Sequence, residues 1–154
     1  MAPVERRTVV QAGGRAKAYR PLPPVERRRA LAFGLEAYDR GDFFEAHELL
    51  EPAWMGTDDL AERAFLQGLI KLAAGFVHAT RGNPTGVAKN LAGARDHLAV
   101  AGAAEAGRAA GVDVPRILAA IDERLVELRA SAEHGRDEPV RAIRVARVAP
   151  RREG

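Results

Sequence analysis

Glycine, proline and capping residues divide the middle of the chain into helical segments, and this punctuation restricts the fold more than any other feature. Pro24 begins a predicted helix that runs to Arg40, with apolar residues at helical spacing. Gly41 supplies the stop for this helix. Asp42 and Glu45, three positions apart, match the capping box that opens a second helix. The pattern predicts two helices joined by a tight turn.

Further caps predict three more helices. Asp58 or Asp59 caps a third helix that runs to Arg81, Asn83 caps a fourth, and Asp113 opens the last one. Because the connections are short, neighbouring helices are expected to be antiparallel. The predicted fold class is all-α, with about five helices in a compact bundle built from two antiparallel helical hairpins plus a C-terminal helix.

A weak internal repeat supports the two hairpins. The turn sequence Arg40-Gly41-Asp42 matches Arg81-Gly82-Asn83 after a shift of 41 residues. The same shift superposes further pairs of small and apolar residues, namely Gly34 on Gly75, Leu50 on Leu91 and Ala53 on Ala94.

Basic residues are concentrated at the two ends. Residues 1–29 carry eight Lys or Arg against two acids, and residues 135–154 carry six against three. We therefore predict a flexible basic N-terminal tail at 1–24, a helical domain at 25–134 and a basic C-terminal tail at 135–154. Within the last segment, residues 141–148 alternate apolar and basic side chains, which fits a short strand, an extended arm lying on the domain or, as the favoured interpretation, a mobile tail.

The charge distribution makes a nucleic-acid-binding domain unlikely. The net charge of the whole chain is +3, yet residues 30–134 hold ten Lys or Arg against sixteen acids. DNA-binding domains usually carry their basic stripe on the folded surface. The absence of cysteine, of a long apolar run and of a secretory signal pattern predicts a cytoplasmic protein with no membrane span.

Ionisable residues, together with Gln67 and with Trp54 at the edge, gather on the second and third predicted helices although both helices are rich in apolar residues. Charged groups in apolar surroundings are costly unless they are paired, so the cluster needs an explanation. We take its members as candidate site residues, without assigning a catalytic role to any of them: Glu45, His47, Glu48, Glu51, Trp54, Arg63, Gln67, Lys71 and His78.

Three interpretations of this cluster remain open. The favoured one is a partly buried pocket that binds a small polar ligand or a protein partner. The second is a network that only fixes helix register, in which Arg63 forms forks with Glu48 or Glu51, with nucleic-acid contact through the tails. The third is a metal-assisted hydrolase using His47, Glu48 and Glu51, although the cations Arg63 and Lys71 oppose a metal. No metal or cofactor is expected, enzymatic activity is uncertain, and self-association is left open.

The run F-x-E-A-H-E-x-L-E-x-x-W, from Phe43 to Trp54, together with R-x-F-L-Q-G-L-I after it, resembles the family described as domain of unknown function 309. The matching residues also include His78 and Gly82-Asn83, and the similarity covers about residues 30–100. The resemblance implies a small all-helical domain of bacteria and archaea with no settled activity. Pro52 and Lys71 depart from the family pattern.

Overall fold

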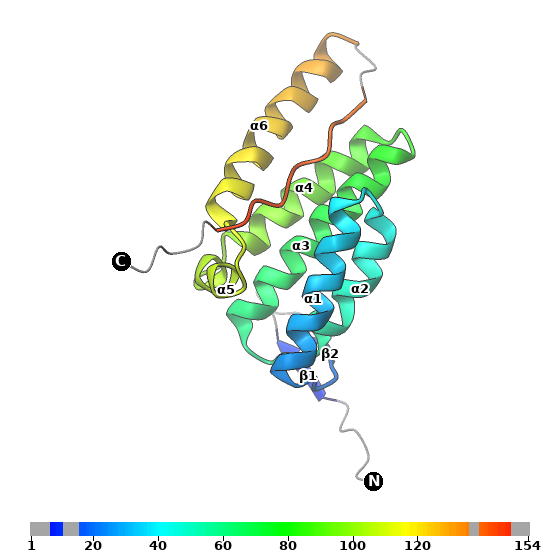
Figure 1. Cartoon of the computed structure of the whole chain (residues 1–154). Helices are drawn as coiled ribbons and strands as arrows, with labels where there is room; N and C mark the ends of the chain where they lie inside the picture. Colours follow the sequence, from blue (N-terminus) through cyan, green and yellow to red (C-terminus); the bar gives the residue numbers. More distant parts are fainter. Residues whose placement is uncertain (1–6, 11–15, 136–138, 149–154) are drawn as a thin grey trace, which may run out of the picture.

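The computed structural model describes residues 7–10, 16–135 and 139–148, and over these ranges the protein is a helical bundle preceded by a short hairpin. Figure 1 shows the helices side by side, with a C-terminal segment laid along them. The elements are β1 Arg7–Val10, β2 Ala16–Tyr19, α1 Pro24–Asp39, α2 Phe43–Met55, α3 Leu60–Thr80, α4 Pro84–Leu98, α5 Ala103–Ala109 and α6 Val114–Glu133.

The helix boundaries follow the local signals of the sequence. Asp59, Asn83 and Asp113 each accept a hydrogen bond from the backbone N–H three residues ahead, as N-caps do. Gly41 and Gly82 adopt positive φ of 85° and 65° at the two hairpin turns, a backbone conformation that glycine adopts without steric cost. The predicted caps at these three helix starts and the two glycine stops are confirmed.

Two expectations for the helices are corrected. The described residues contain six helices instead of five, because the alanine-rich stretch after α4 forms the short helix α5. The prediction of a capping box at the start of α2 is wrong, because the Asp42 side chain accepts no capping hydrogen bond. Both Asp42 and Glu45 instead pair with the guanidinium of Arg40. The all-α class of the domain holds.

Helix α3 lies at the centre of the bundle. It packs against α2, α4 and α5, and its residues Phe65, Leu69, Leu72 and Phe76 are almost completely buried. Two of its polar side chains, Gln67 and Lys71, lie beside residues of α2, and Lys71 also contacts α4.

The internal repeat corresponds to a helix contact that occurs in both hairpins. Gly34 of α1 faces Leu50 of α2, and Gly75 of α3 faces Leu91 of α4. A Cβ at Gly34 would lie 2.6 Å from Leu50, whereas one at Gly75 would lie 3.5 Å from Leu91. The first hairpin is thus packed more closely at this point than the second.

Residues before α1 are attached to the end of α2. Strands β1 and β2 pair antiparallel, with Arg7 opposite Tyr19. The N–H groups of Arg20 and Leu22 then donate to the carbonyls of Met55 and Gly56, at 2.8 and 3.0 Å. The described part of the predicted N-terminal tail therefore contains a hairpin and a segment bonded to the domain.

The segment 139–148 lies on the domain, which corrects the favoured interpretation of a mobile tail. Ile143 and Val145 are buried in the core, and the hydroxyl of Tyr38 in α1 donates to the Ile143 carbonyl. Val112 and Arg147 form an antiparallel bridge, and the Arg147 guanidinium pairs with Asp39. In Figure 1 this arm, coloured orange to red, runs back between α6 and the hairpins. The extended arm, named as an alternative from the alternating pattern, is the arrangement found.

None of the helices in the described ranges combines the length and the apolar character that crossing a membrane requires.

Candidate functional site

Helices α2 and α3 enclose a small pocket that collects five of the nine candidate residues. Its volume is about 210 Å³. Apolar side chains of α3 form part of the wall, and polar groups from both helices form the remainder. The lining residues are His47, Glu51, Trp54, Gln67, Ile70, Lys71 and Ala74.

The wall of this pocket contains two buried polar atoms that have no hydrogen-bond partner among the described residues, His47 Nδ1 and Gln67 Oε1. The nearest carboxylate oxygen to His47 Nδ1, Glu48 Oε1, is 3.5 Å away, longer than the roughly 2.7–3.2 Å of an N–H···O hydrogen bond. Buried polar atoms are nearly always paired with protein, water or ligand groups. The pocket therefore has unmet hydrogen-bonding capacity on both of its helices.

The carboxylates nearest the pocket belong to Glu48 and Glu51, one turn apart on α2. One ligand atom from each of His47, Glu48 and Glu51 can be chosen so that all three lie within 4.8 Å of one another. His47 and Glu51 are half-buried, whereas Glu48 is exposed. Four acceptor-bearing side chains, these three and Gln67, thus gather at this part of the α2–α3 interface.

Lys71 is the cation on the pocket wall. Its side chain is half-buried, and its aliphatic stem passes Gly93 of α4, where a Cβ would lie 3.6 Å from Lys71 Cδ. The stem is therefore held against α4 while the residue lines the pocket. The site contains acceptors from His47, Glu51 and Gln67 and a positive charge from Lys71.

Arg63 is fully buried but does not line the pocket. Its Nη1 donates to the carbonyls of Trp54 and Thr57, at 3.2 and 3.0 Å, and its guanidinium carbon lies 4.9 Å from the centre of the Trp54 ring. Burial lowers the pKa of Arg63 below its ordinary value. The predicted forks from Arg63 to Glu48 or Glu51 are corrected: Glu48 faces solvent, and these Arg63 contacts fasten the C-terminal end of α2 to α3.

Glu45 and His78 lie away from the pocket. Glu45 pairs with Arg40 at 2.9 Å on the exposed side of α2. His78 lies at the end of α3, with Nδ1 3.2 Å from the Asn83 amide nitrogen and its ring against Gly86. Both residues share a helix with the cluster but not the pocket.

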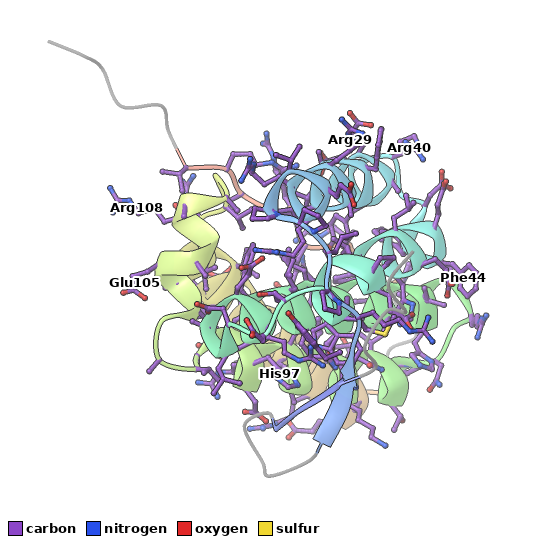
Figure 2. All side chains as sticks on the ribbon, turned by 90° about the horizontal axis from the view of Figure 1, so that it is seen from below. Arg29, Arg40, Phe44, His97, Glu105 and Arg108 are labelled. Carbon is purple, nitrogen blue, oxygen red and sulfur yellow. The ribbon has the colours of Figure 1, made fainter. Side chains whose placement is uncertain are left out.

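A larger hollow of about 410 Å³ lies at the turn end of the first hairpin. Phe44, one of its lining residues, points outward at the edge of the molecule in Figure 2. Its two acidic residues, Asp42 and Glu45, are already paired with Arg40. We place the candidate site in the smaller pocket, because that wall contains the unmatched buried atoms.

The sequence-based selection missed two lining residues, Ile70 and Ala74. Both fall on the same side of α3 as Gln67 and Lys71 at spacings of three and four residues, so the helical period contained the signal. They were missed because nothing in the sequence distinguishes a pocket-lining apolar residue from the other apolar residues of this helix.

A separate, partly buried set of contacts connects α1 to the start of α3 and to the loop before it. Glu62 accepts from Arg27 Nε at 2.7 Å and from the hydroxyl of Thr57 at 3.2 Å, and Thr57 is itself buried. This contact fixes the loop whose carbonyl Arg63 binds, so the Thr57 region has a structural explanation.

Comparison with known proteins gives a family but no activity. No curated protein matches the chain. The sequence model of the family described as Domain of unknown function (DUF309) matches residues 31–90, which include α2, α3 and all seven lining residues of the pocket. The resemblance to this family, drawn from the motif, is confirmed by the match over residues 31–90.

Proposed function

We propose that the protein is a helical ligand-binding module whose pocket between α2 and α3 binds a small polar molecule. The observation that carries the proposal is the pair of buried atoms, His47 Nδ1 and Gln67 Oε1, that have no partner among the described residues and share one pocket wall. Leaving a buried polar group unsatisfied costs about 1–3 kcal/mol, and a ligand that supplies donors removes this cost.

The charges on the wall define the polarity of the ligand. His47, Glu51 and Gln67 offer acceptors, so they favour an electropositive or donor-bearing end, while the Lys71 ammonium favours an electronegative end. A volume of 210 Å³ holds about seven water-sized volumes of roughly 30 Å³ each. The site therefore suits small organic acids, amino acids or inorganic anions.

The fluorescence of Trp54 can report ligand binding, because Trp54 is the single tryptophan of the chain and lines the pocket. We expect its fluorescence to change on titration with at least one of glycine, β-alanine, acetate or phosphate, each added with and without Zn²⁺. Lys71→Met should weaken that binding at least tenfold, whereas Lys89→Met, an exposed lysine of α4, should leave it within twofold.

Two results would count against the proposal. One is no response to any of these probes under either condition. The other is equal binding by wild type, Lys71→Met and Lys89→Met, which would place the bound molecule outside the pocket. Gln67→Leu gives a second check, because removing the unmatched acceptor should lower affinity without destabilising the fold.

A further inference from the structure

Three neighbouring side chains of α2 can also hold a metal ion, and we infer that His47, Glu48 and Glu51 form a binding site for one divalent first-row transition metal such as Zn²⁺. This inference rests on the proposed function and specifies it further: the electropositive end of the bound species would be the metal, and its electronegative end an anion held between the metal and Lys71.

The distances within the triad suit a metal after small side-chain rotations. In a tetrahedral site with bonds of about 2.0–2.1 Å, neighbouring ligand atoms lie roughly 3.4 Å apart. His47 Nδ1 and Glu48 Oε1 are already 3.5 Å apart, and the widest separation in the triad is within 4.8 Å. Glu48 is exposed, so its carboxylate can rotate to close the remaining gap.

The donor set fits a transition metal better than calcium or magnesium. One imidazole and two carboxylates match the ligands of zinc and iron, while magnesium and calcium prefer oxygen alone. Neutral imidazole uses a ring nitrogen lone pair for a metal, and His47 Nδ1 is a buried ring nitrogen without a hydrogen-bond partner among the described residues. Three protein ligands leave a fourth coordination position open, which is the arrangement of catalytic zinc sites.

The placement of the cations removes one objection to a metal. The sequence suggested that Arg63 and Lys71 would both oppose a cation at this place. Arg63 instead lies over the Trp54 ring and donates to two carbonyls, and it does not line the pocket. Lys71 is left on the wall, with two carboxylates beside the site to balance it. A positive charge near a bound metal is a suitable partner for an anion that also contacts the metal.

Metal binding is measured on its own, before any organic ligand is added. The full chain is stripped with EDTA, dialysed, and titrated with ZnCl₂ by calorimetry, with Trp54 fluorescence as a second signal. We expect one equivalent of Zn²⁺ to bind with a micromolar or lower Kd. His47→Gln and Glu51→Gln should each weaken binding at least tenfold.

Glu45→Gln is the matched control, because it removes the same charge from the same helix outside the triad. It should change the Kd by less than twofold. Lys71→Met should tighten Zn²⁺ binding severalfold, since it removes a like charge, and an indirect effect on folding would not do this. Circular dichroism checks that each variant is folded.

The possible outcomes separate the two proposals. No stoichiometric binding by the wild-type chain, or equal weakening by Glu45→Gln and Glu51→Gln, overturns the metal site. If either of these results is found and an anion still binds in the presence of EDTA, the metal site is wrong but the pocket proposal stands. Zn²⁺ binding without a response to any anion supports the metal site and overturns the proposed function.

Discussion

At the scale of single residues, Arg63 is the clearest case of a charge placed for structure. It is completely buried, and its contacts include the carbonyl of Trp54 near the end of α2, the carbonyl of Thr57 in the following loop, and the Trp54 ring. A buried guanidinium loses hydration, which is why its pKa is lowered, and the hydrogen bonds offset part of that loss. The residue fixes the C-terminal end of α2 beside the pocket without entering it.

Replacing Arg63 by Ala is expected to destabilise the protein by about 2–4 kcal/mol, because it leaves a cavity and two carbonyls without this donor. Arg28→Ala, an exposed arginine in α1, is the matched control and should change the free energy of unfolding by less than about 0.5 kcal/mol. Urea denaturation of the two variants measures both values. Similar small changes for the two would mean that the Arg63 contacts add nothing to stability.

At the scale of helices, the two hairpins share a glycine–leucine contact between their helices, but the helices are packed more closely at this contact in the first hairpin than in the second. Gly34 faces Leu50 so closely that an added Cβ would lie 2.6 Å from its side chain, and Leu50 is almost fully buried. Gly75, the repeat-related position, has room for a methyl group at ordinary contact distance, 3.5 Å from Leu91. The same substitution should therefore have opposite effects in the two hairpins.

Gly75→Ala is expected to stabilise the protein by up to about 1 kcal/mol, because alanine is the better helix former. Gly34→Ala should destabilise it by about 1–3 kcal/mol, since α1 and α2 or Leu50 must move. Thermal and urea denaturation of the pair test this. If both variants shift stability in the same direction, the difference in helix spacing is not the deciding factor.

At the scale of the whole molecule, the arm at 139–148, which is the last described segment, contacts the C-terminal end of α1. Tyr38 of α1 donates to the Ile143 carbonyl, and Arg147 pairs with Asp39. Burial, with a smaller effect of the Asp39 charge, raises the pKa of Tyr38 far above its ordinary value of 10.0. The folded protein therefore keeps the phenol proton at pH values where the unfolded chain releases it.

This linkage predicts how stability depends on pH. Above pH 10 the unfolded state binds fewer protons than the folded state, so the Tyr38 contribution falls by up to about 1.4 kcal/mol per pH unit. Tyr38→Phe should be less stable than wild type by about 1–2 kcal/mol at pH 8, because Ile143 loses its hydrogen bond. The difference should shrink by pH 11. Urea denaturation at both pH values measures it, and a constant difference would mean that Tyr38 ionises equally in both states.

Much of the fold could be predicted from the sequence because its causes are local. A cap such as Asp59, Asn83 or Asp113 bonds a backbone N–H three residues away, and a glycine stop needs only its own φ. The family motif likewise lies in consecutive residues of α2 and α3. Asp42 is the instructive failure, since Arg40, two residues away, competes for its carboxylate.

The site could be predicted only in part. Helical periodicity gives the angle of a side chain around the helix but not its neighbours along the axis. His78 shares the Lys71 side of α3 but lies seven residues further on, about 10 Å along the helix. Its ring contacts Asn83 and Gly86 at the turn between α3 and α4. Glu45 lies outside the pocket, where its carboxylate forms an ion pair with Arg40.

The sequence by itself determined the all-α class, five of the six described helices, the two glycine turns and the resemblance to the DUF309 family, because each depends mainly on residues close together in the chain. Tertiary structure decided which polar groups of α2 and α3 share a pocket, that Arg63 binds carbonyls instead of carboxylates, and that the last described segment packs on α1 and α6. These outcomes depend on distances between residues far apart in the chain, such as Tyr38 and Ile143. A pattern in one segment contains no information about such distances.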